Sequence, residues 1–278
     1  MNLTVSMFKP ISILTILLLL AVSLSSAQTS PEKIAVTRPI ISQPLPFKIG
    51  ETLTYDVTFS KLIFSGTIGE LKLTVSRSTD LSRPELLEFK AEGVSKGFFP
   101  SLFGVKIKDR YISLVSQTDF GVHASTKLLD EGKIRREQKS VFDRQAGRVI
   151  YTDRDLTRQK SEPKVKEKAS PSWVQDLLSS IYFVRTQPLK EGDVIPVPVS
   201  DGGEVYNIEV VVGKREEIKN AAGKVRVIQL NAKVFDGRYI RRSGEMLVWV
   251  TDDAERIPVR ARVKTSGTTV TVELKRMP

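Results

Sequence analysis

Apolar and polar residues alternate along most of the chain from residue 47 onward, and this period of two constrains the fold more than any other feature. In "GETLTYDVTFS", Leu53, Tyr55 and Val57 fall on one face, because successive side chains of a strand point to opposite sides. The pattern recurs in "GTIGELKLTVSRS", "VKIKDRYISLVS", "KVRVIQLNAKVF" and "RIPVRARVKTS", with turn residues between the runs. These runs predict long antiparallel strands.

Residues 172–186 break this period and predict a helix. Apolar side chains recur there at spacings of one, three and four, which is typical of a helix with a wide apolar face. The face comprises Trp173, Leu177, Leu178, Ile181 and Tyr182. Ser170 or Ser172 is the expected N-cap, and Pro188 prevents continuation of the helix.

We therefore expect a mainly β fold: an antiparallel curved sheet that forms an open barrel or clamshell, with one central helix packed on its concave side. A single β-rich domain would span 47–278, with halves at 47–157 and 188–278. Between them, "RQKSEPKVKEKASP", residues 158–171, is charged and lacks aromatic residues. We expect a mobile loop at 158–171, followed by the helix as a crossover between the halves.

The first 27 residues predict export. Lys9 precedes an apolar run from Ile11 to Leu24, and small residues follow, so we expect a signal peptide cut after Ala27. The alternative is a retained membrane anchor, but the run is shorter than the roughly 20 residues that a spanning helix needs. Residues 28–46 contain four prolines and are expected to form an extended leader. The predicted location is the periplasm or the exterior of the cell.

The chain has no cysteine and is basic. An exported fold without disulfides must depend on its core for stability. There are 43 Lys and Arg against 32 Asp and Glu, and removal of Lys9 with the signal leaves 42 − 32 = +10. A charge of this sign suits anionic lipid headgroups or acidic glycans. Nucleic acid is disfavoured by export and by the lack of aromatic residues interleaved with the cations.

Few residues could carry catalysis. His123 is the only histidine in the sequence, and without cysteine or a "GxSxG" motif it favours neither a nucleophilic triad nor a metal site. A glycosidase needs only two carboxylates, so a glycan-active enzyme is kept as the least favoured alternative. Its candidate acids are Glu51, Asp56, Glu70, Asp176 and Asp253. We expect no enzyme activity, no cofactor and no metal.

Two cationic surfaces are candidates for binding an anionic envelope surface. In "SKGFFPSLFGVKIKDRY", an aromatic loop containing Phe99 precedes Lys106, Lys108 and Arg110, which would share one face of a strand. Alternatively, the aromatic loop could close the end of the barrel as part of the core. In "PVRARVK", Arg260, Arg262 and Lys264 alternate with apolar residues. The alternative for this row is an ordinary solvated strand face.

Three segments carry a resemblance to a known family: "GETLTYDV" at 50–57, "DLLSSIYFVRTQPLKEGD" at 176–193 and "LVWVTDDAERIPVRARV" at 247–263. Together they resemble the bacterial envelope family catalogued as domain of unknown function 3108, over roughly residues 45–276. The resemblance implies an exported β-rich protein with a curved, partly open barrel, of the kind that binds acyl chains in lipoprotein trafficking. It implies no catalytic activity.

These observations favour an exported, non-enzymatic cell-envelope protein that binds a lipid-like or amphipathic ligand or an anionic envelope surface. The residues expected to line a ligand cavity are Trp173, Leu177, Ile181, Tyr182, Trp249 and Phe99. The alternative is a scaffold or adaptor for another envelope protein, which would have a packed interior and would act through exposed strand edges.

Overall fold

The computed structural model describes residue 41 and residues 43–61, 64–97, 106–220 and 223–277. These residues form one 14-stranded sheet in which neighbouring strands are antiparallel. The strands of the first half are β1 (Thr52–Lys61), β2 (Phe64–Arg77), β3 (Leu86–Ser95), β4 (Lys108–Ser116), β5 (Val122–Glu131), β6 (Ile134–Asp143), β7 (Arg148–Asp155) and β8 (Lys164–Ala169). Those of the second half are β9 (Val194–Asp201), β10 (Glu204–Asn220), β11 (Gly223–Ala232), β12 (Gly244–Thr251), β13 (Pro258–Thr265) and β14 (Thr268–Leu274).

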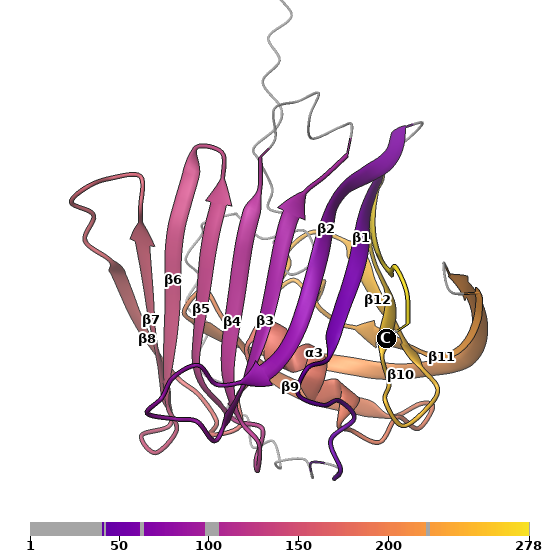
Figure 1. The fold of residues 1–278 in the computed structure, drawn as a ribbon, viewed down its shortest axis with the longest axis horizontal. Coiled ribbons are helices and arrows are strands. Elements are labelled where there is room, and N and C mark those ends of the chain that lie inside the picture. The colour runs from indigo at the N-terminus through magenta and orange to yellow at the C-terminus, as the bar shows by residue number, and fades with distance from the viewer. Residues whose placement is uncertain (1–40, 42, 62–63, 98–105, 221–222, 278) are drawn as a thin grey trace, which may run out of the picture.

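The two halves join through the first and last strands. The strand order runs from β8 down to β1, continues into β14 and ends at β9. Strands β8 and β9 are therefore the two edges, and the connection between them crosses from one edge to the other. The sheet curves so that its two ends approach each other around a helix, labelled α3 in Figure 1. The predicted curved antiparallel sheet with a helix on its concave side is confirmed.

Helix α3 (Leu177–Arg185) is shorter than expected. The prediction of a start at residue 172 with Ser170 or Ser172 as N-cap is wrong: Asp176 is the N-cap, and its carboxylate accepts hydrogen bonds from the backbone N–H of Leu178 and Ser179. Ser172 and Trp173 instead lie in a turn, in which the N–H of Val174 donates to the carbonyl of Pro171, and Gln175 forms a parallel bridge with Val199 of β9. The local backbone pairing with the edge strand replaces the first helical turn.

Aromatic packing holds α3 against the first half of the sheet. The ring of Tyr182 stacks on Phe89 of β3 with centroids 4.1 Å apart, and Phe47 packs edge-on against both rings. The helix contacts β3 and β4 on this side and β9 on the other. It is therefore enclosed by the sheet, and both of its faces are apolar contact surfaces.

The prediction of a loop over residues 158–171 is wrong in its second part, because β8 lies there and pairs with β7. All six side chains of β8 are exposed, so no apolar alternation marks this strand in the sequence. Its order comes from backbone pairing and from Lys166 and Lys168, which contact Glu204 at 3.6 and 3.0 Å. These contacts link the β8 edge to β10 across the opening of the sheet.

The segments predicted as signal peptide and most of the leader lie outside the described residues. Within the described ranges, no helix has the length and apolar character needed to cross a membrane.

Candidate functional site

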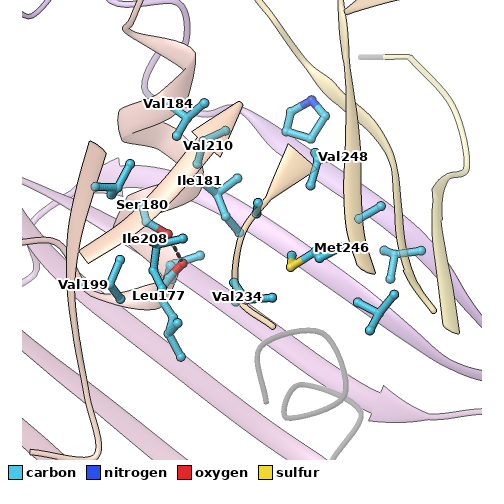
Figure 2. A pocket seen from close by; sticks show the side chains of 18 of the residues that line it. Leu177, Ser180, Ile181, Val184, Val199, Ile208, Val210, Val234, Met246 and Val248 are labelled. Carbon is cyan, nitrogen blue, oxygen red and sulfur yellow. Dashed lines mark hydrogen bonds between the residues drawn. The ribbon is translucent and has the colours of Figure 1, made fainter. Parts of the chain in front are cut away.

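An apolar cavity lies between α3 and the second half of the sheet. Strands β9 to β13 supply the largest part of its wall, and the β11–β12 connection supplies another part (Figure 2). Strands β1 to β3 of the first half also contribute, through Tyr55, Leu71, Leu73 and Ala91. Leu177, Ile181 and Val184 contribute from the helix, and Met246 and Val248 from β12. The helix thus presents aromatic contacts to the first half of the sheet and aliphatic groups to the cavity.

The polar groups in the cavity wall already have partners. The hydroxyl of Tyr55 donates to the carbonyl of Pro258 at 2.9 Å, and that of Ser180 to the carbonyl of Leu177 at 2.8 Å. The Arg260 guanidinium pairs with a Glu273 carboxylate oxygen at 2.8 Å. Since each of these groups already has a partner and the rest of the lining is apolar, the wall offers an incoming molecule mainly apolar contact.

The cavity has a volume of about 150 Å³. An apolar protein cavity of about 150 Å³ can stay dry and bind a molecule of the size of benzene. Pockets for drug-sized ligands are larger, about 300–1,000 Å³. The volume therefore suits a short alkyl segment or a single ring rather than a whole lipid.

Of the predicted cavity residues, Leu177 and Ile181 line the cavity. Tyr182 follows Ile181 in sequence but lies in the aromatic cluster with Phe89, so the expectation that it faces the cavity is corrected. Trp173 precedes the helix and packs on Phe183 with ring centroids 5.8 Å apart. Both aromatic side chains stabilise the helix on its other side.

Trp249 is also placed away from the cavity, which corrects the expectation that it lines it. Its indole N–H donates to Glu216 at 2.8 Å, and the Arg262 guanidinium lies 5.1 Å from the ring centroid. The alternation of β12 explains this, because Met246 and Val248 face the cavity and Trp249 points to the opposite side. The last predicted cavity residue, Phe99, lies outside the described residues.

Sequence reasoning missed the contribution of the connection between β11 and β12. Val234, Phe235, Tyr239 and Ile240 of this connection line the cavity. Their signal in the sequence was the apolar and aromatic content of "KVFDGRYI", which is unusual for a connection that also contains a Gly turn.

The predicted cationic residues lie on strands that are not neighbours in the sheet. Lys106 and Lys108 are exposed at the start of β4, and Arg110 pairs there with Glu92 at 3.3 Å. Lys264 is exposed on β13, where the other two members of its row, Arg260 and Arg262, are engaged by Glu273 and Trp249. Binding of an anionic surface by either set stays a prediction.

The candidate acids have structural partners. Asp176 caps α3 and Asp253 accepts backbone N–H bonds from Glu255 and Arg256. Asp56 and Glu70 are cross-strand neighbours that share Lys275, at 3.3 and 2.8 Å. The side chains of the described ranges contain no group of three or more His, Cys, Asp or Glu arranged to hold a metal ion.

His123 belongs to a charged cluster at the start of β5. Its Nε2 lies 3.1 Å from a guanidinium nitrogen of Arg144, which also contacts Asp119. Burial lowers the pKa of the His123 imidazole, and the nearby Arg144 charge lowers it further.

Glu51 has a different role, at a junction of the three segments that carried the family resemblance. Arg185 at the end of α3 donates to both carboxylate oxygens of Glu51, at 2.7 and 2.8 Å, and to the carbonyl of Glu255. Arg256 donates in turn to the carbonyls of Arg185 and Gln187. The segments therefore build a structural junction at the C-terminal end of the helix.

A family model described as "Protein of unknown function (DUF3108)" matches residues 54–275. None of the curated proteins matches the chain. The fold is similar to the crystal structure of a β-barrel-like protein of domain of unknown function 1849 from Brucella abortus, with a TM-score of 0.51, 9% identity, and coverage of 82% of this chain and 96% of that one. A putative exported protein with a YmcC-like fold from Bacteroides fragilis matches with a TM-score of 0.33, 9% identity, and coverage of 84% and 98%.

Proposed function

The chain belongs to the DUF3108 family of unknown function, and we propose that it is an exported, non-enzymatic cell-envelope protein that binds the apolar part of a lipid-like or amphipathic ligand. The observation that carries this proposal is the cavity of about 150 Å³ between α3 and β9–β13.

The driving force for binding would be removal of apolar ligand surface from water. Burial contributes about 25 cal/mol per Å² of apolar surface. Entry of an apolar molecule into the cavity breaks no hydrogen bond, because the polar groups that line the cavity are already paired with other side chains or with the backbone. The size of the cavity supports capture of a short chain segment or the end of a longer chain. A cavity of this size and lining selects a ligand by its shape and apolar character rather than by its charge.

The absence of enzymatic activity is part of the proposal. Three of the acids considered for glycoside hydrolysis support this part of the proposal, because they already have structural partners. Asp176 caps the helix, Asp253 accepts backbone hydrogen bonds in a turn, and Glu51 is in an ion pair with Arg185. Export is supported by the pattern of residues 1–27.

The sheet edges favour ligand binding over an adaptor that pairs through strands. Edge β8 carries Lys164, Lys166 and Lys168, and edge β9 carries Pro196 and Pro198. Lysine and proline on edge strands are features that oppose pairing with another strand. Both edges therefore disfavour strand addition.

The proposal is tested by mass spectrometry of organic extracts from the purified protein, compared between two variants. Ala261→Leu adds three carbons to the cavity wall, whereas Ala124→Leu adds them on β5 beside the exposed side chain of Val141. We expect an apolar compound at near-stoichiometric yield with the wild type and Ala124→Leu, and its loss from folded Ala261→Leu. Absence of a compound from all three proteins, or equal yields, would overturn the proposal.

A further inference from the structure

The apolar cavity has a closed end and an open end. Lining side chains at the closed end are buried, as at Leu177, Val199 and Ile208. Lining side chains at the open end are half-buried, and they come from the helix, from β11 to β13 and from the β11–β12 connection: Ser180, Ile181, Ala232, Phe235, Met246, Val248 and Ala261. A molecule that enters by its apolar end therefore leaves its other end at this opening.

The β11–β12 connection, residues 233–243, borders the opening. Its Phe235 lines the cavity and is half-buried, and the ring lies against Gly244, where a Cβ would be 2.6 Å from Phe235 Cε1. Gly244 is the first residue of β12. Arg242 and Arg241 precede Gly244 by two and three residues, so the backbone that carries them lies beside this part of the opening.

Arg241 also lies near a pair of tyrosines at the cavity wall. Tyr239 lines the cavity, and its ring centroid is 4.7 Å from that of Tyr206 on β10. Burial raises the pKa of the Tyr206 hydroxyl to about 12, and the positive charge of Arg241 acts on this pKa in the opposite direction. The Arg241 guanidinium therefore acts electrostatically on a group that borders the cavity.

The segment that carries these arginines has an excess of positive charge. Residues 233–245 contain four cations against two acids, a net charge of +2: Lys233, Arg238, Arg241 and Arg242 against Asp236 and Glu245. Asp236 is held by Arg238 at 2.8 Å. The acids near Tyr206, which are Asp201 and Glu204, each have a lysine partner. Since Arg241 and Arg242 are both exposed, they give the surface beside the opening a positive potential.

We propose that Arg241 and Arg242 bind an anionic head group at the opening of the cavity, so that the ligand is an amphiphile with one alkyl chain and a negatively charged head. The inference rests on the proposed function, since it needs the alkyl chain in the cavity. The cavity wall selects the chain without regard to charge, and the two arginines add attraction for an anion outside it. Because both arginines are exposed, the head group stays in contact with water and avoids the desolvation cost of a buried charge.

The test compares four probes at pH 7 and low salt: 1-hexanol, hexanoate, hexylammonium and acetate, with dissociation constants measured by NMR titration. We expect hexanoate to bind about two- to tenfold more tightly than 1-hexanol, which is the range for one or two exposed ion pairs. Hexylammonium should bind more weakly than 1-hexanol, and acetate more weakly than hexanoate because it lacks the chain. The advantage of hexanoate should shrink in about 0.5 M salt, since salt screens exposed charges.

The variant Arg241→Gln with Arg242→Gln should bring hexanoate binding to within about twofold of 1-hexanol binding and leave 1-hexanol binding unchanged. Its matched control is Arg154→Gln with Arg158→Gln, which removes the same charge from exposed positions on β7 and the turn after it, outside the cavity wall. The control should keep the full advantage of hexanoate. Unchanged 1-hexanol binding shows in both variants that the cavity is still folded.

The outcomes separate this inference from the proposed function. Hexanoate binding no tighter than that of 1-hexanol or hexylammonium, or equal losses of hexanoate affinity in both double variants, would overturn the inference while 1-hexanol binding keeps the proposed function. Acetate binding as tight as hexanoate binding would also overturn it, because the anion would then bind without the chain. Failure of both 1-hexanol and hexanoate to bind would overturn the proposed function and this inference with it.

Discussion

Arg185 and Glu51 are 134 residues apart in sequence, yet their side chains form a bidentate ion pair. The Arg185 side chain is 1% exposed and that of Glu51 is 9% exposed. The guanidinium also lies over the rings of Phe47 and Tyr182, at 5.3 and 5.4 Å from their centroids. The pair therefore ties the segment before β1 to the end of the helix inside the sheet.

Arg185→Met is expected to lower the free energy of unfolding by about 3–5 kcal/mol, because it leaves the buried Glu51 carboxylate without its partner. The double variant Arg185→Met with Glu51→Leu should be more stable than Arg185→Met alone, since the uncompensated charge is then removed. Urea unfolding measures both differences.

The control for this prediction is Arg158→Met, whose side chain is 80% exposed and lies 3.5 Å from Asp155. An exposed pair of this kind should change stability by less than about 1 kcal/mol. Equal losses for Arg185→Met and Arg158→Met would contradict a structural role of the buried pair.

The Asp176 carboxyl should make stability depend on pH. Burial raises its pKa, and this effect exceeds the lowering by hydrogen bonds from Ser113 and from the N–H of Ser179 and Leu178. A group with a raised folded pKa contributes stability below its unfolded pKa of about 3.9 and loses that contribution as pH rises through the folded pKa. Relative to the wild type, Asp176→Asn should therefore gain stability as pH rises from about 4.

Asp80→Asn is the control for pH dependence, because the sign is reversed there. Hydrogen bonds from the hydroxyl and backbone N–H of Ser82 lower the pKa of the Asp80 carboxyl. The stability contribution of Asp80 is lost as pH falls through its folded pKa, so the wild type should lose stability relative to Asp80→Asn below about pH 4. Urea unfolding across this pH range compares the two variants, and the same sign for both would argue against the burial effect at Asp176.

The sequence predicts the strands well where one face is buried, and fails where it is not. The alternation at Leu53, Tyr55 and Val57 marks β1 because these side chains enter the core. Strand β8 escapes this signal because its side chains are all exposed, and it is held by backbone pairing with β7 and by ion pairs such as that of Glu167 with Arg148. Backbone pairing of a strand with no buried face leaves no apolar alternation in the sequence.

The site is less predictable than the fold, because α3 is buried on both sides. Ile181 and Tyr182 are adjacent and both apolar in character, yet one lines the cavity and the other stacks on Phe89. The helical period identifies a buried face but does not tell which part of the sheet it meets. The spacing of the apolar residues places Trp173 in the helix. The helix begins only after Asp176, whose carboxylate accepts two backbone hydrogen bonds as the N-cap.

Gly203→Ala is expected to be more destabilising than Gly202→Ala. Both glycines have positive φ, +81° and +60°, so both substitutions carry backbone strain of about 1–2 kcal/mol. A Cβ at Gly203 would also lie 2.8 Å from Lys166 Cδ and 3.0 Å from the Tyr151 ring. A Cβ at Gly202 would have no neighbouring heavy atom of the described residues within 4 Å. The extra loss at Gly203 should be about 1–3 kcal/mol in urea unfolding. Equal losses would mean that the hairpin does not press against β7 and β8.

Replacement of the β8 lysines should expose an edge that can pair. Lys164, Lys166 and Lys168 lie along this edge strand, and the triple change to Thr removes the charges while keeping a residue that favours strands. We expect the triple variant to form larger species with rising concentration, measured by size-exclusion chromatography with light scattering.

The control makes the same change in net charge away from the edge, at Lys72, Lys108 and Lys139 of β2, β4 and β6, each of which is exposed. These strands have neighbours on both sides, so loss of their lysines uncovers no backbone hydrogen-bonding groups. If the control variant associates as much as the edge variant, lower net charge is the cause. Association of the edge variant alone would identify the β8 lysines as the feature that keeps the open sheet from extending into another chain.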